Sequence, residues 1–258
     1  MSHAVLSAAM AGALFAGMLL FLEVGRRTGR RRAARDAEQA SLGLGAVDGA
    51  VFALLGLLIA FSFSGASARF DNRRHLIVEE TNAIGTAYLR LDLLRPDARS
   101  TLQALFRSYL DARLAIYRAI PDLDAARAEL ARAEALQEEI WRAAVPAARE
   151  SDTPGTPMLL LPALNAMFDL AATRTAAMLM HPPTIVFVMV SALALASSLL
   201  AGFGMAAASS GRWIHMIAFA AALAGACYVI LDVEFPRLGM IQVSNFDALL
   251  VKLRAGMR

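Results

Sequence analysis

Four long apolar stretches constrain this chain more than any other feature of its sequence. They run from Ala4 to Leu22, from about Leu44 to Ala66, from Pro183 to about Ala208 and from about Trp213 to Leu231. A helix needs roughly 20 apolar residues to cross a hydrocarbon layer about 30 Å thick. Inside that layer the backbone polar groups must be bonded within the segment. The sequence therefore predicts an all-α integral membrane protein with four transmembrane helices, whose first partner is the lipid bilayer.

A helical insert is expected between the second and third stretches. From Ala68 to Pro182 there are 14 Arg and 15 Asp or Glu, and apolar residues recur at the helical period of three and four. Helices are predicted at 69–94, 96–120, 122–149 and 157–180, the first of them continuous with the second span. The expected organisation is two spans with an Arg-rich loop (1–66), an extramembrane helical domain (67–182), two further spans (183–233) and a C-terminal tail (234–258).

The basic residues are distributed as in a membrane protein. The chain has 25 basic and 22 acidic residues, a net charge of +3. Six arginines lie in the first loop, "RRTGRRRAARDAEQ", and with Arg212 they make seven basic residues on that face against six at the other span ends. The positive-inside rule places the first loop in the cytoplasm and the insert on the extracytoplasmic side of a bacterial inner membrane. No nucleic-acid partner is expected.

Signatures of enzymes and metal sites are missing from the sequence. The single cysteine, Cys227, excludes a disulfide or a cysteine metal site within one chain. No GxSxG, P-loop, HExxH or GxGxxG motif occurs in a suitable context. The pair His75 and Glu79 supplies too few ligands for zinc. No enzymatic activity, cofactor or metal ion is therefore expected.

The second span carries small residues at helical spacing, namely Gly45, Gly49, Ala53, Gly56, Ala60 and Ser64. Such a stripe lets helices approach closely, either within one chain or around the axis of a homo-oligomer, where it would line a pore. Asp48 either reaches the interface or faces protein or water. Phe61 and Phe63 point in different directions, so at most one of them forms a hydrophobic constriction.

Beyond Ser67 the same helix becomes amphipathic. Its polar residues follow one another at steps of three and four: Asp71, His75, Glu79, Asn82, Thr86 and Arg90. This stripe is either an ordinary solvated face or the vestibule of an ion path, in which arginines concentrate inorganic anions. The pore and vestibule candidates are Asp48, Gly56, Ala60, Phe61, Phe63, Ser64, Arg69, Asp71, Arg73 and Arg74.

Charged and amide side chains gather near several span ends and form a second group of candidates. They are Glu79, Glu80, Asn82, Asn165, Asp169, Arg174, His181, Asp232, Glu234 and Arg237. We expect an ion-pair network that docks the insert onto the spans. A charged vestibule for ions is the alternative.

Three stretches of the chain, residues 56–94, 161–183 and 231–243, resemble the bestrophin-like domain proteins of bacterial membranes. They contain "GLLIAFSFSGASARFDNRRHLIVEE", "LPALNAMFDLAATRTAAMLMHPP" and "LDVEFPRLGMIQV". The family name implies likeness to bestrophins, which are oligomeric anion channels whose second span lines a neck with aromatic residues. That resemblance implies Phe61 or Phe63 as the neck residue. A bestrophin-like calcium clasp is not expected, because it needs a dense acidic cluster.

Two functional hypotheses follow. The first is a homo-oligomeric channel or channel-like protein, lined by the second span and passing anions. The alternative is a non-conducting scaffold or sensor, whose helical insert binds a protein partner or a ligand.

Overall fold

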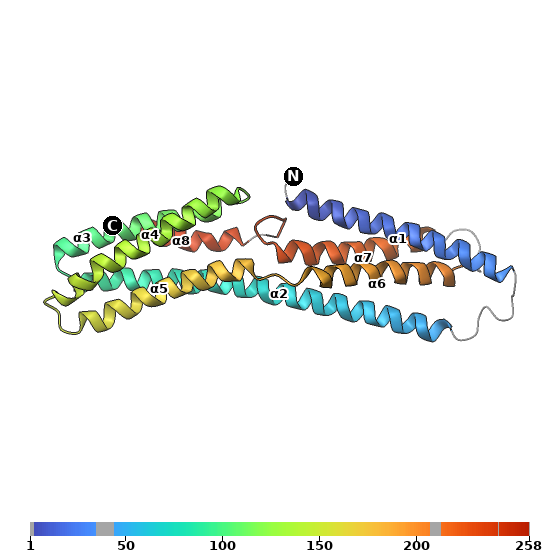
Figure 1. The fold of residues 1–258 in the computed structure, drawn as a ribbon, viewed down its shortest axis with the longest axis horizontal. Helices are drawn as coiled ribbons and strands as arrows, with labels where there is room; N and C mark the ends of the chain where they lie inside the picture. The colour runs from blue at the N-terminus through green and yellow to red at the C-terminus, as the bar shows by residue number, and fades with distance from the viewer. Residues whose placement is uncertain (1–2, 35–43, 207–212, 242, 258) are drawn as a thin grey trace. The chain divides into compact units, whose positions relative to one another are not determined.

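A computed structural model describes residues 3–34, 44–206, 213–241 and 243–257 (Figure 1). These residues form α-helices and one short 3-10 helix and contain no strand, which confirms the all-α prediction. Ala208, Arg35 and Arg212, which enter the predictions of spans and orientation, lie outside the described residues. The helices are α1 (His3–Ala33), α2 (Leu44–Arg90), η1 (Leu91–Leu93), α3 (Pro96–Ala119), α4 (Leu123–Arg149), α5 (Thr156–Leu179), α6 (Thr184–Gly204), α7 (Trp213–Glu234) and α8 (Ser244–Gly256).

The chain divides into two compact units. The membrane unit contains residues 1–68 and 181–240, and the insert unit contains residues 69–180 and 241–258. Four helical segments are long and apolar enough to cross a membrane: Val5–Arg32, Gly45–Leu93, Thr156–Gly204 and Trp213–Glu234. The protein is therefore a multi-pass membrane protein. Helix α2 runs unbroken for 47 residues and contributes to both units, as its sequence predicts.

Glycines bring α1 and α6 into close contact in the membrane unit. A Cβ atom on Gly25 would overlap the carbonyl oxygen of Leu199, and one on Gly202 would overlap that of Leu22. Gly29 lies four residues after Gly25, on the same side of α1, and faces the backbone of Phe203. Because lipid supplies little hydrophobic force between helices, close backbone packing of this kind holds spans together.

Local signals in the sequence set the helix boundaries of the insert unit. Pro96 occupies the first turn of α3, where its missing N–H costs nothing. Asp122 caps α4 by accepting hydrogen bonds from the backbone N–H groups of Asp124 and Ala125, both at 3.1 Å. Gly155 precedes α5 with φ at +81°, a left-handed conformation that glycine adopts without steric cost. Helices 3, 4 and 5 then enclose an apolar core with Phe106, Ile140 and Leu164 among its fully buried members.

The C-terminal residues form a helix where the sequence predicts only a tail. Helix α8 packs on α3 (Figure 1) and buries Leu250 completely. Arg254 of α8 forms a bidentate ion pair with Asp111 of α3, at 2.8 and 2.9 Å. The helix was missed because only 13 residues of weak amphipathic pattern encode it, and its partner surface lies more than 100 residues earlier in the chain.

The α1–α6 contact predicts a large effect from single methyl groups. Gly25→Ala and Gly202→Ala should each destabilise the protein by about 1–3 kcal/mol, because rigid backbone atoms must move apart. Gly12→Ala, also on α1, is the matched control, since its Cβ would meet no described atom within 4 Å. The thermal midpoint in detergent should fall for the first two variants and stay level or rise for Gly12→Ala. Equal midpoints for all three variants would contradict the contact.

Candidate functional site

One face of helix α2 is uncovered along the membrane-spanning part of the helix. A Cβ atom placed on Gly45, Gly49 or Gly56 would meet no atom of the described residues within 4 Å. Ala53, Ala60 and Ser64, the other members of the predicted small-residue stripe, are also exposed. The covered face carries Leu55, which is 2% exposed and belongs to the apolar core of the membrane unit. The stripe thus takes no part in packing within the described chain.

The two candidate phenylalanines differ in their relation to this stripe. Positions seven apart on an α-helix lie within about 20° of each other, so Gly49, Gly56 and Phe63 share one face. Phe61 is rotated from Phe63 by two residues, about 200°, and is 66% exposed against 47% for Phe63. Asp48 is only half-buried and lies near the start of α2. The geometry favours Phe63 as the aromatic residue of the uncovered face.

Arg73 and Arg74, which the sequence makes candidates for a vestibule, contact other parts of the insert unit. Arg73 is only 6% exposed and donates hydrogen bonds to the carbonyl oxygens of Ala177, at 3.2 Å, and Met180, at 3.0 Å. These carbonyls end helix α5, where a cation complements the helix dipole and the unpaired acceptors. Arg69 is half-buried. Arg73 therefore caps the end of α5, and a role in concentrating anions stays a prediction.

Arg74 is held between two aromatic rings and an acid. Its guanidinium lies 4.5 Å from the ring centroid of Phe246 and 5.5 Å from that of Phe70. It also pairs with Asp71 at 3.1 Å. The Asp71 side chain remains 66% exposed, and that of Glu79, which pairs with His75, remains 41% exposed. The partners of these acids, Arg74 at 40% and His75 at 70%, are exposed as well, so this part of α2 presents paired charges.

A buried ion-pair cluster lies inside the insert unit, centred on Glu80. The Glu80 carboxylate is fully buried and accepts hydrogen bonds from Arg113 of α3, at 2.7 Å, and Arg174 of α5, at 2.5 Å. Arg174 also pairs with Asp247 of α8 at 2.9 Å. Two arginines and two acids balance one another, and the cluster joins α2, α3, α5 and α8.

Tyrosines complete this cluster. The hydroxyl of Tyr117 accepts a hydrogen bond from Arg113 at 3.0 Å, and the Arg174 guanidinium stacks 4.0 Å from the Tyr117 ring centroid. Burial alone would lower the pKa of Arg113, but the neighbouring Tyr117 and Glu80 raise it above its ordinary value. Burial raises the pKa of Tyr109 to about 12. Arg113 therefore stays charged, and Tyr109 stays neutral, across the physiological range.

The other predicted docking residues divide between the two units. His181 pairs with the fully buried Glu234 at 2.9 Å and stacks on Phe235, with ring centroids 4.6 Å apart, inside the membrane unit. Asp232, 2% exposed, accepts a hydrogen bond from the backbone of Met240 at 2.9 Å. Asn82, Asn165 and Asp169 are exposed, and Arg237 is half-buried. The pairs that Glu80 makes with Arg113 and Arg174 and the pair of Glu234 with His181 thus belong to separate clusters, each within its own unit.

A family model of the bestrophin-like domain matches residues 11–246. The chain belongs to the bestrophin-like domain family. Separate searches among curated proteins and among solved structures find no match. The bestrophin-like match includes all of α2 to α7, and with them the uncovered face and most of the buried cluster. Membership of this family is consistent with a channel-like protein.

Sequence reasoning missed several residues that organise this bestrophin-like chain. Arg113 and Tyr117 stand four apart on α3, a spacing that places them on one face, but nothing in the sequence connects them to Glu80, which lies 33 residues before Arg113. Asp247 lies in the segment 234–258, for which the sequence predicts only a C-terminal tail. The packing glycines Gly25 and Gly202 were also missed, although "GRRTG" on α1 contains the GxxxG spacing that is typical of close helix contacts.

The Glu80 cluster predicts a strong and specific loss of stability. Glu80→Gln should destabilise the protein by about 3–5 kcal/mol, because two buried arginines lose the charge that compensates them. Glu138→Gln removes a similar carboxylate whose pair with Arg142 is exposed on both sides, and it should leave stability nearly unchanged. Thermal midpoints in detergent check this comparison. Similar small shifts for the two variants would exclude a stabilising role of the cluster.

Proposed function

We propose that the chain assembles into a homo-oligomeric ion channel of the bacterial inner membrane, with helix α2 of each copy lining the ion path. The uncovered small-residue face of α2 is the observation that carries this proposal. Gly25 and Gly202 pack tightly against backbone atoms of the same chain, whereas a Cβ on Gly45, Gly49 or Gly56 would meet no described atom within 4 Å. A second copy of the same helix is the partner that this face fits.

The packing of the membrane unit supports a path between copies rather than through one. Apart from one small cavity, its interior is packed with apolar side chains, among them Met18, Leu22 and Leu55, each at most 2% exposed. Water and ions have no route through such a core. Helices with small residues on one face can instead approach a common axis and enclose a narrow aqueous path.

Phe63 is the constriction that we propose for this path. It follows Gly49 and Gly56 on the same face at intervals of seven residues, and it stands one turn before the polar residues that begin after Ser67. A ring of aromatic side chains narrows a path and expels water from it, which stops ions until the ring widens. Phe61 points away from this face and fits a contact with lipid or a neighbouring helix.

The charge of the transported ion is decided by the side chains beyond the span. Family resemblance implies anions. The exposed acids Asp71 and Glu79 favour cations, since rings of carboxylates select for cations. Arg73, expected to attract anions, instead donates hydrogen bonds to the carbonyl groups at the end of α5. The distribution of arginines in the first loop supports an insert on the extracytoplasmic side. No enzymatic role is proposed.

Flux through reconstituted protein tests the proposed path. Phe63→Ala should raise the ion flux into vesicles several-fold, because it removes the hydrophobic constriction. Phe61→Ala, the matched control two residues away, should leave the flux within about twofold of wild type if Phe61 lies off the path. Planar-bilayer currents in a potassium chloride gradient give the reversal potential and hence the sign of the ion. An intact oligomer that passes no ion in any variant would contradict the channel hypothesis and support the scaffold hypothesis.

Cysteine cross-linking tests the assembly independently of conduction. In a Cys227→Ser background, Gly49→Cys should form disulfide-linked dimers in native membranes under mild oxidation, because the small-residue faces of neighbouring copies approach closely. Leu55→Cys, on the covered face of the same helix, is the control and should remain monomeric. Non-reducing gels give the readout. Cross-linking of both positions, or of neither, would contradict an α2-lined axis.

A further inference from the structure

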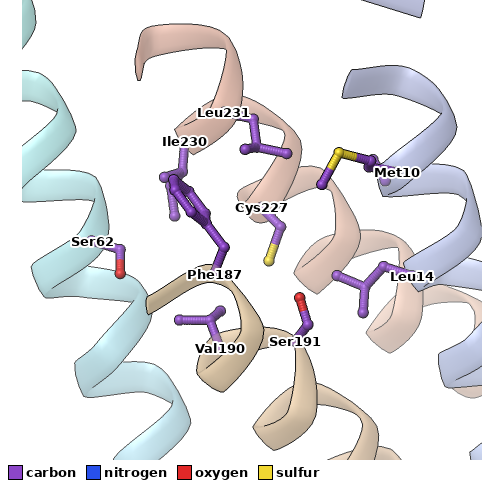
Figure 2. Close-up of a pocket in the computed structure, with 10 residues that line it drawn as sticks. Met10, Leu14, Ser62, Phe187, Val190, Ser191, Cys227, Ile230 and Leu231 are labelled. Carbon is purple, nitrogen blue, oxygen red and sulfur yellow. The ribbon is translucent and has the colours of Figure 1, made fainter. Parts of the chain in front are cut away.

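A small cavity lies inside the membrane unit, between all four of its long helices (Figure 2). Its walls come from α1, α2, α6 and α7, and it is lined by Met10, Ala11, Leu14, Ser62, Phe187, Val190, Ser191, Cys227, Ile230 and Leu231. The cavity measures about 60 Å³. A single water needs roughly 10–15 Å³ on the same measure, so there is room for a short run of non-hydrogen atoms rather than for one solvent molecule.

The lining chemistry suits an apolar occupant. Seven of the ten residues are wholly apolar or thioether side chains, and the remaining three offer two hydroxyls and one thiol. Figure 2 shows the Ser191 hydroxyl and the Cys227 thiol pointing toward each other across the middle of the cavity. With seven apolar side chains among the ten, the lining resembles that of aliphatic and aromatic cavities, which stay dry and bind apolar molecules.

The position of the lining residues along their helices indicates one leaflet of the bilayer. Met10 lies within three turns of the start of α1, and Phe187 lies in the first turn of α6. Cys227 and Leu231 lie in the last two turns of α7, and Ser62 lies shortly before the polar part of α2. These are the span ends opposite the arginines of the first loop. Met10, at 49% exposed, opens one side of the cavity to the surroundings of the helices, which at this depth are hydrocarbon.

We infer that this cavity binds the acyl chain of a bilayer phospholipid from the leaflet on the insert side. An acyl chain is the apolar ligand present at that depth, and a few of its methylenes fill a cavity of this size. A chain that is already in hydrocarbon gains only packing contacts when it enters the cavity. The site therefore exchanges lipid readily. Its occupant touches Ser62, which lies on the covered side of α2, one residue before Phe63. An occupied site therefore adds packing contacts to the side of α2 opposite the uncovered face.

Photo-cross-linking to the protein in lipid vesicles tests this site. The probe is a phosphatidylcholine with a diazirine on its acyl chain, and adducts are located by peptide mass spectrometry. Adducts are expected on the Cys227 and Ser191 segments. Ala11→Leu fills the cavity and should reduce these adducts at least fivefold, whereas Ala9→Leu, exposed on the same helix, should leave them unchanged. Adducts confined to outward-facing positions, or equal adducts in both variants, would overturn the inference.

The single cysteine supplies a second measurement that does not depend on a variant folding. In phospholipid nanodiscs, the thiol of Cys227 should react with the apolar probe N-phenylmaleimide at least tenfold faster than with a sulfonated maleimide of similar size. A charged reagent that reacts equally fast would show a water-filled cavity and overturn the inference. A disulfide between two copies through Cys227 would show that a second chain covers the cavity, which would also overturn it.

Discussion

The absence of a hydrophobic driving force inside hydrocarbon is the constraint on which this structure depends. Helices that cross a bilayer gain nothing by hiding apolar side chains from lipid tails that are equally apolar, so they must gain from close contact. The α1–α6 pair meets this requirement with Gly25 and Gly202, each set against a backbone carbonyl of the other helix. Helix α2 carries glycines as well, yet a Cβ atom on Gly45, Gly49 or Gly56 would meet no described atom within 4 Å. The same residue type therefore builds one contact and leaves another surface open.

The insert unit is stabilised by different physics. Its helices α3, α4 and α5 bury Phe106, Ile140 and Leu164 in an ordinary apolar core, as a domain exposed to water does. Within it, Glu80 joins four helices through a cluster of two arginines and two acids. A buried charge is costly unless it is compensated, and here every charge has a partner. The cluster therefore specifies which helices meet, and α8 is included because Asp247 supplies the fourth charge.

Helix α2 connects these two environments in one continuous rod. Its uncovered face changes from glycine and alanine within the span to Asp71, His75 and Asn82 beyond it, while its covered face changes from Leu55 to Arg73 and Glu80. A channel helix needs this combination, because one side must be anchored while the other meets water. On the covered side, Arg73, which the sequence makes a candidate for an anion-attracting vestibule, binds the end of α5. The acids Asp71 and Glu79 remain exposed on the same helix.

The sequence by itself determined the membrane class, the helical content, the helix boundaries of the insert and the unbroken course of α2. These properties depend on local composition, on period and on residues such as Pro96 and Asp122, whose effects extend over only a few positions. Tertiary structure alone decided that Arg73 caps α5 and that Glu80 meets Arg113 and Arg174. It also decided that the glycine face of α2 is uncovered and that residues 244–256 form a packed helix. A charged side chain has the same sequence signature whether it is solvated or paired, and its partners here lie 33, 94 and more residues away. Only the three-dimensional packing of the helices brings these partners together.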